Sequence, residues 1–294
     1  MEAKMSDFKI IVDSSCDLPS SFVEAVNADV ASLVVSLGER VFRDRKDITS
    51  HELFDRIKET HILPATSALN VNDLTELFKV ALSKNKLVIF LTVSSKLSGL
   101  YEKAIFAREQ IPDKDRLVIL DSQQISSGIA LLAMAIRRDL DSGKGLDQII
   151  ASHKDRVPKV HMSFVIDKLD HLNHGGRCSG LTFFIGSKLR LHPIIAVDKG
   201  EMAVRKLVTK TNIDKGIDIM VQEFKDDLEK GNVDLSYPIL VPTCLCPNGI
   251  KRMLHDLTPL VGEKILFPVE ASAVIASHCG SNAIGLAYMK RVAD

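Results

Sequence analysis

Tryptophan is absent from this chain of 294 residues, and tyrosine occurs only 3 times. A sugar-binding site lined by tryptophan is therefore excluded. The 12 phenylalanines and a hydrophobic content of 46% still allow an aliphatic cavity. Together with 26% charged residues, this is the composition of a folded globular protein, and the length is that of about two domains.

The chain also lacks an excess of either charge, because 38 Lys and Arg residues balance 38 Asp and Glu residues. Non-specific binding to nucleic acid requires a cationic surplus that releases counterions, and a polybasic membrane anchor requires a cationic cluster. The longest apolar runs, Leu87–Val93 and Ile129–Ile136, are far shorter than the roughly 20 residues of a spanning helix. We expect no nucleic-acid partner and no stable insertion into a membrane.

Cysteine is scarce, and its odd number and scattered spacing are not typical of a disulfide framework. The five residues are Cys16, Cys178, Cys244, Cys246 and Cys279. The pair Cys244 and Cys246 lacks the second pair that a structural zinc site needs. The first residues contain no extended apolar segment typical of a signal peptide. We therefore expect a cytoplasmic protein without a metal site or cofactor.

The first half of the chain alternates apolar strand-like segments with amphipathic segments, which favours an α/β domain with a mainly parallel sheet. Strands are predicted at Phe8–Val12, Val30–Leu37, Leu87–Thr92 and Leu117–Leu120. Helices are predicted after Pro19, from the capping box Thr49/Glu52 to about Thr60, and at Asn72–Ser83, Leu100–Glu109 and Ser127–Leu140. We place this domain at residues 1–157, with the boundary near Val157-Pro158.

The second half, residues 158–294, is predicted to be an α+β domain with a mixed sheet, because it combines a hairpin with crossover segments. Strands are predicted at His161–Ile166, Pro193–Val197, Met202–Val208, Ile239–Val241, Ile265–Val269 and Val274–Ser277. Helices are predicted up to Leu189, at Asn212–Lys230, near Asn248–Leu257 and after Asn282.

Hydroxyl side chains follow the predicted strands, in loops such as Ser14-Ser15 and the segment containing Ser94, Ser95 and Ser98. In open α/β sheets, ligands bind beyond the carboxyl ends of the strands. Thr66 and Ser67 could add hydroxyl groups to the same crevice. The alternative is that these residues only cap or lead into the helices that follow them.

Two other segments carry polar groups that a ligand or partner could use. The turn Gly175-Gly176-Arg177 presents a cation to an anion or an acidic surface, or it is simply a structural turn. His278 could contact a polar head group, or it could be a buried histidine satisfied by the backbone. Neither a dinucleotide fingerprint nor a phosphate-binding loop is matched.

Taken in order, these segments resemble those of the DegV family. The matching segments are Ile11–Pro19, Thr66-Ser67, Ser94–Gly99 with Tyr101, Leu172 with Gly175–Arg177, Ser187–Leu189 with His192–Ile194, and Ser277–Gly280. The chain departs from the family pattern in two loops, because Thr66–Asn70 lacks the proline and final serine of T-S-x-P-S, and Gly280-Ser281-Asn282 replaces a Gly-Pro-Gly run.

The resemblance implies a two-domain protein that binds a long-chain fatty acid, such as palmitate, in a tunnel between its domains. It implies a carrier and not an enzyme, which presents the fatty-acid carboxylate to a separate ATP-dependent kinase for acyl-phosphate formation in phospholipid synthesis. The carboxylate contacts carry over to Thr66, Ser98 with nearby Ser95, and His278, with Ser67 and Ser94 as possible additions. Arg177 would face the kinase.

A hydrolase that uses a serine nucleophile with His278 is the alternative function. It would explain the serines, but the G-x-S-x-G turn of many such enzymes is missing. The absence of a Gly-Lys phosphate loop agrees with a kinase supplied by another protein.

Overall fold

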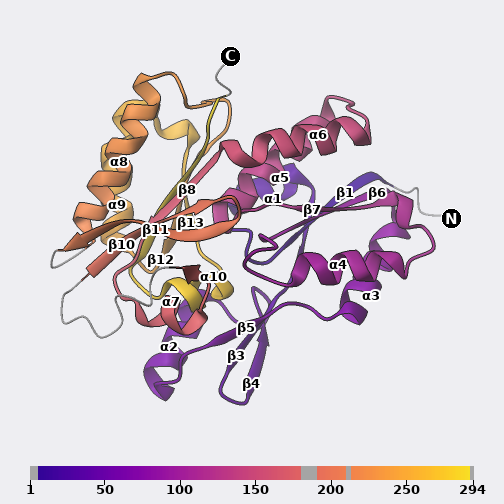
Figure 1. The fold of residues 1–294 in the computed structure, drawn as a ribbon, viewed down its shortest axis with the longest axis horizontal. Helices are drawn as coiled ribbons and strands as arrows, with labels where there is room; N and C mark the ends of the chain where they lie inside the picture. The colour runs from indigo at the N-terminus through magenta and orange to yellow at the C-terminus, as the bar shows by residue number, and fades with distance from the viewer. Residues whose placement is uncertain (1–5, 180–190, 210–212, 292–294) are drawn as a thin grey trace.

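The computed structural model describes residues 6–179, 191–209 and 213–291. Two large sheets lie side by side, and a small sheet lies below their junction (Figure 1). The predicted fold class is confirmed, because the first large sheet is parallel and the second is mixed. The predicted helix that ends at Leu189 lies outside the described residues.

The first sheet has four parallel strands in the order β2-β1-β6-β7. Its strands are β1 (Ser6–Asp13), β2 (Ala28–Ala31), β6 (Asn85–Thr92) and β7 (Leu117–Asp121). Helices α3 and α4 lie on one side of this sheet, and α1, α5 and α6 lie on the other (Figure 1). Their bounds are α1 (Ser20–Val26), α3 (Val71–Leu82), α4 (Leu100–Glu109), α5 (Ser126–Asp141) and α6 (Leu146–Arg156).

A three-stranded antiparallel sheet, β4-β3-β5, was not anticipated from the sequence. It consists of β3 (Val34–Leu37), β4 (Arg40–Arg43) and β5 (Ala65–Ser67). The single strand predicted at Val30–Leu37 is wrong, because the chain changes sheets within it. Ser14 binds the chain on both sides of this change: its backbone N–H donates to Ala31 O at 2.9 Å, and its Oγ accepts from Leu33 N at 3.0 Å.

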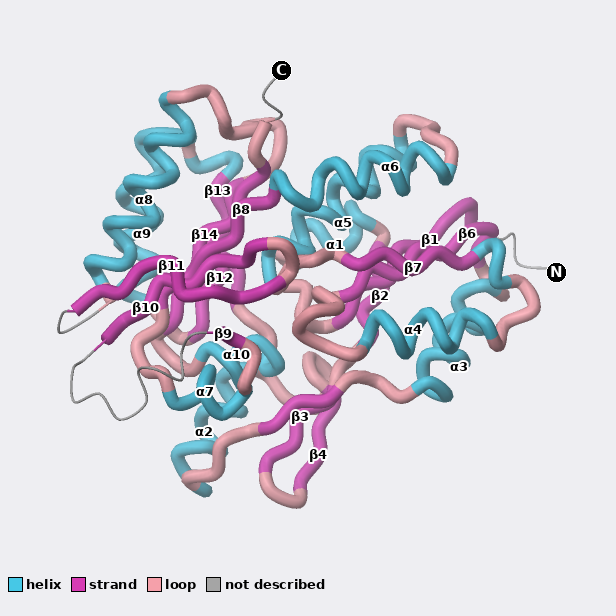
Figure 2. The backbone as a smooth tube through the Cα atoms, viewed as in Figure 1, coloured by secondary structure: helices cyan, strands magenta, loops and turns pink. Residues whose placement is uncertain are grey.

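Helix α2 (Ser50–Thr60) joins β4 to β5 and begins where its capping box predicts. Thr49 Oγ1 accepts from the backbone N–H of Glu52, and the Glu52 carboxylate accepts from Thr49 N at 2.8 Å. These two hydrogen bonds satisfy N–H groups that the helix itself leaves free. In Figure 2 the β3–β4 hairpin projects away from both large sheets.

The mixed sheet has seven strands in the order β13-β12-β14-β8-β10-β11-β9. They are β8 (Val160–Val165), β9 (Cys178–Ser179), β10 (Leu191–Asp198), β11 (Glu201–Thr209), β12 (Ile239–Cys244), β13 (Leu266–Glu270) and β14 (Ala283–Met289). The helices of this half are α7 (Asp170–Gly175), α8 (Asp214–Glu229), α9 (Pro247–Val261) and α10 (Ala273–Cys279). Short 3₁₀ turns occur at Lys114–Arg116, Val157–Lys159 and Glu263–Ile265. The antiparallel β10–β11 pair confirms the predicted hairpin.

The strand predicted at Val274–Ser277 and the helix predicted after Asn282 are both wrong, because the order is helix α10 and then strand β14. Ser272 caps α10 by accepting from Ile275 N at 3.2 Å. All seven residues of β14 are buried between β12 and β8. A fully buried central strand shows no alternation of apolar and polar residues, so its sequence does not distinguish it from a buried helix.

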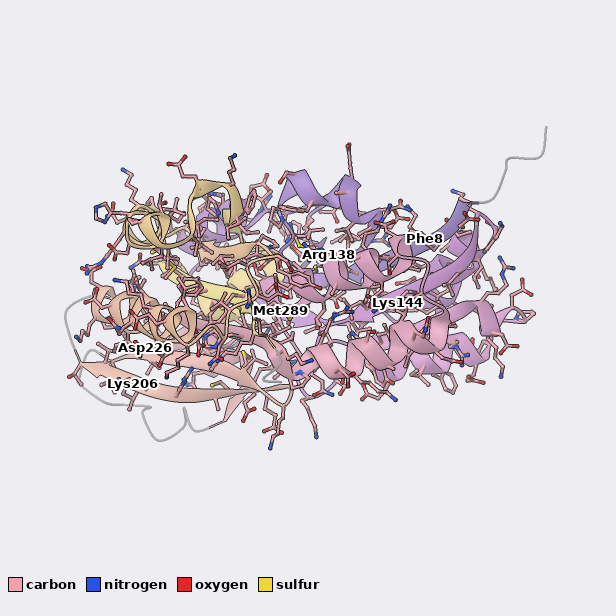
Figure 3. All side chains as sticks on the ribbon, turned by 90° about the horizontal axis from the view of Figure 1, so that it is seen from above. Phe8, Arg138, Lys144, Lys206, Asp226 and Met289 are labelled. Carbon is pink, nitrogen blue, oxygen red and sulfur yellow. The ribbon has the colours of Figure 1, made fainter. Side chains whose placement is uncertain are left out.

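Helix α5 packs against strands of both large sheets, and the apolar run Ile129–Ile136 is buried within it. Beyond this run, Arg138 crosses to the second half, where its guanidinium lies 4.0 Å from the ring centroid of Tyr237. Arg138 also donates to the backbone oxygen of Ser236 at this junction, and Figure 3 labels Arg138 on the side of the first half that faces the second. Among the described residues, no helix is both long and apolar enough to cross a membrane.

Candidate functional site

A cavity of about 290 Å³ lies where the two large sheets and the small sheet meet. Most of its walls are apolar, and they include Leu33, Ala68, Val93, Leu97, Ile125, Leu172, Met202, Val274 and Ile275. Its polar wall residues are Ser15, Thr66, Ser67, Ser98, Lys103, Arg177 and His278. Among the described residues that line it, none is acidic. An apolar pocket with a few convergent polar groups is typical of a small-molecule site.

Thr66 and His278, which are 212 positions apart in the sequence, form the polar pair of this cavity. Pairing with Val35 of β3 fixes the position of Thr66 in β5, and His278 lies in the last turn of α10. Thr66 Oγ1 lies 2.8 Å from His278 Nε2. The structure therefore brings together two residues that were predicted to contact the same head group.

The imidazole of His278 is held in its neutral form. Burial, followed by the nearby Arg177 guanidinium and two histidines, lowers the pKa of His278 to about 4. Its Nδ1 atom is buried and has no hydrogen-bond partner within the described part of the chain. A Cβ added at Gly175 would overlap this Nδ1 atom, so the glycine of the Gly175-Gly176-Arg177 turn allows α7 and α10 to approach closely.

Ser98 lines the cavity from the loop that leads into α4. Gly99, and not Ser98, occupies the N-cap position of that helix. The Ser98 Oγ accepts from Leu100 N at 3.3 Å, so the hydroxyl supports the start of the helix while it faces the cavity. Ser67 also lines the cavity and is exposed to solvent.

Ser94 and Ser95, which were predicted to be near the same head group, do not line the cavity. The buried hydroxyl of Ser94 donates to Gly200 O at 2.7 Å, at the tip of the β10–β11 hairpin. The hydroxyl of Ser95 donates to Asp121 Oδ2 at 2.6 Å, at the end of β7. Both serine hydroxyls therefore bind other parts of the chain and hold the loop around Ser98 in position.

Arg177 lines the cavity and is exposed to solvent. Its Nη1 donates to Gly175 O. Gly176 ends helix α7 with a φ of 65°, a left-handed conformation that glycine adopts without steric cost. The turn therefore places a cation at the cavity wall, and its exposure leaves the cation accessible to a partner.

Two buried carboxylates that sequence analysis did not single out position helix α10. Asp17 Oδ1 accepts from Ser272 N at 2.9 Å and from Arg45 Nη2 at 2.6 Å. Asp44 Oδ1 accepts from Ala273 N at 2.9 Å. These contacts fix the start of the helix that carries His278.

Lys103 was also missed among the polar wall residues. Its backbone N–H donates to Gly99 O, one helical turn earlier, and helical side chains lean toward the N-terminus, so a helix that begins after Gly99 directs Lys103 back toward the Ser94–Gly99 segment. That spacing was the signal that could have found it.

Comparison with known proteins agrees with this architecture. The family model described as "Uncharacterised protein, DegV family" matches residues 7–291. A DegV domain-containing protein from Clostridium acetobutylicum is 27% identical over 98% of this chain and 100% of the relative. A protein from Thermotoga maritima named fatty acid-binding protein is 26% identical, over 94% of this chain and 96% of the relative.

A solved structure supports the same assignment at the level of fold. It is described as fatty acid binding of a DegV family protein from Thermus thermophilus. It superposes with a TM-score of 0.86 at 24% identity, and the match covers 96% of this chain and 99% of the other. The chain belongs to the DegV family.

Proposed function

We propose that this chain binds a long-chain fatty acid in the cavity, with the carboxylate hydrogen-bonded by Thr66 and Ser98. The observation that carries the proposal is the convergence of these hydroxyls and neutral His278 on one mainly apolar cavity without an acidic wall residue among those described. The names of the DegV relatives that bind fatty acids support it.

The acyl chain supplies most of the affinity in this proposal. Burying one CH₂ group contributes about 0.8 kcal/mol, so a chain of roughly sixteen carbons contributes on the order of 10 kcal/mol before ordering costs. The carboxylate opposes binding, because an unpaired buried charge is costly. Hydrogen bonds from hydroxyl groups offset that cost.

His278 orients Thr66 in this proposal. At neutral pH the imidazole carries one proton, because its pKa is lowered to about 4. If Nε2–H donates to Thr66 Oγ1 across the 2.8 Å contact, the Thr66 hydroxyl proton is free to donate to the carboxylate. Single hydrogen bonds from hydroxyl groups also leave the carboxylate more able to react than a bidentate ion pair with an arginine would.

We further propose that the protein is a cytoplasmic carrier that presents the carboxylate to a separate ATP-dependent kinase, with Arg177 facing that partner. The support is the exposure of Arg177 at the wall of the same cavity. The alternative of a serine hydrolase gains no support, because His278 pairs with a threonine and no carboxylate in the described part of the chain contacts its Nδ1.

The double variant Thr66→Ala with Ser98→Ala tests the head-group assignment. Each hydrogen bond to a charged group contributes about 1.5–3 kcal/mol, so we expect the loss of two to lower palmitate affinity by roughly 100-fold or more. Displacement of the neutral dye Nile red measures that affinity. The control Ser83→Ala removes an exposed hydroxyl that binds Val80 O and does not line the cavity, and it should keep the original affinity. Equal affinities in all three proteins would refute the assignment.

A further inference from the structure

Lys103 is a half-buried cation in the cavity wall, and the fatty-acid contacts described above do not use it. Across residues 6–179, 191–209 and 213–291, its Nζ has no hydrogen-bond or ion-pair partner among the interactions observed. By contrast, Lys79 on the neighbouring helix α3 forms an ion pair with Glu76. A half-buried cation without a protein partner is available to pair with an anionic ligand in the cavity.

The geometry of α4 directs Lys103 toward the proposed head-group contacts. The Lys103 backbone N–H donates to Gly99 O at 3.2 Å, so the two residues are one helical turn apart. Helical side chains lean toward the N-terminus, which carries the Lys103 stem over the turn that holds Gly99 and Ser98. A Cβ added at Gly99 would meet nothing within 4 Å, so no described side chain occupies the space beside Gly99, which also lines the cavity.

The charges of the wall favour an anion as well. Its described residues include the cations Lys103 and Arg177 and no Asp or Glu. Arg177 is exposed and donates to Gly175 O, whereas Lys103 is half-buried and unpaired. Hydroxyl groups hydrogen-bond to a carboxylate and to an alcohol alike, but a cation favours only the carboxylate.

We propose that Lys103 determines head-group specificity by pairing with the ligand's negative charge, so that the cavity selects free acids over neutral lipids with the same chain. This inference rests on the proposed function, because it assumes that the acyl chain occupies the cavity. The ammonium group acts as a point charge on a flexible stem, so it can follow an anionic head without fixing its orientation as a bidentate arginine would.

Displacement of Nile red by palmitate and by hexadecanol tests the proposal in the full chain. We expect Lys103→Gln to weaken palmitate binding about tenfold and hexadecanol binding less than about twofold. Lys103→Arg should restore palmitate affinity, because it keeps the charge. Lys96→Gln is the control, because Lys96 is exposed in the preceding loop and does not line the cavity.

The outcomes separate this inference from the proposed function. Equal losses for palmitate and hexadecanol in Lys103→Gln would overturn the inference, since the stem and not the charge would then matter. Unchanged affinity for both lipids would also overturn it. An unmodified protein that binds neither lipid would overturn the proposed function, and the inference with it.

Discussion

Gly175 shows how one residue without a side chain determines the geometry of the site. Its Cα faces Nδ1 of His278, with no space for a Cβ. The neighbouring Gly176 is glycine for a different reason, because its φ of 65° is unfavourable for other residues and nothing lies within 4 Å of its Cβ position. Gly175 is therefore needed for lack of space beside His278, and Gly176 is needed for its backbone conformation.

Substitution of these two glycines should give different effects on ligand binding. Gly175→Ala displaces the His278 ring and breaks its contact with Thr66, so we expect a stability loss of about 1–3 kcal/mol together with weaker palmitate binding. Gly176→Ala should cost about 1 kcal/mol through its backbone alone and keep palmitate affinity. Urea unfolding and dye displacement measure the two quantities. Equal palmitate affinity in the two variants would contradict this view of His278.

The sequence predicted some residues of the cavity correctly and others wrongly, because distant parts of the chain bind some of the predicted hydroxyl groups. Thr66, Ser98 and His278 were expected in one head-group site, and Arg177 on a partner-facing surface, and all four line the cavity. Ser94 and Ser95 have the same chemistry, but acceptors on the β10–β11 hairpin and β7 bind their hydroxyls. Those acceptors are 106 and 26 positions away, so the sequence around Ser94 and Ser95 does not show that their hydroxyls are already hydrogen-bonded.

At the scale of elements, helix α10 depends on Asp17 for its position. This carboxylate accepts hydrogen bonds from Arg45, from Ser272 at the start of α10 and from Ser126 at the start of α5. Burial, as the largest cause, raises the pKa of Asp17 from 3.8 to about 6, although Arg45 acts in the opposite direction. The ionised form therefore holds three segments together at a cost in desolvation.

The cost of ionising Asp17 predicts a pH dependence with a defined sign. The folded state keeps the proton up to about pH 6, whereas the unfolded state releases it near 3.8. The free energy of unfolding therefore falls as pH rises through this window. Asn does not titrate, so the stability of Asp17→Asn should lack this fall. As pH rises from 4 to 7, the difference in free energy of unfolding between the variant and the unchanged protein should shift by up to about 3 kcal/mol in favour of the variant.

Urea unfolding at a series of pH values measures this difference. Asp115→Asn controls for the loss of one negative charge, because Asp115 is exposed. Parallel stability profiles for Asp17→Asn and the unchanged protein would contradict the raised pKa of Asp17.

The mistaken strand at Val274–Ser277 has a related cause. The segment is apolar and includes β-branched residues, which favours a strand locally. The groups that accept the first N–H donors of α10 are Asp17 and Asp44, which precede their donors by 255 and 229 positions. Tertiary contacts therefore decide the structure of this segment, whereas the capping box of α2 is local and was predicted correctly.

At the scale of the whole molecule, the cavity depends on contacts between the two halves of the chain. Thr66 comes from the small sheet, Ser98 from a loop of the parallel sheet and His278 from a helix of the second half. Met202, next to the hairpin tip that Ser94 binds, completes the wall from the mixed sheet. The alternation of strands and helices predicted the parallel sheet, and a hairpin with crossover segments predicted the mixed sheet, but this convergence depends on how the two sheets pack.

Mass spectrometry of small molecules released from the denatured, purified protein tests the central claim most directly. A carrier whose affinity comes from a buried acyl chain should retain its ligand, so we predict about one long-chain fatty acid per chain, without ester turnover by the native protein. A protein that releases no such acid, and that takes up none when incubated with palmitate after delipidation, would contradict the account.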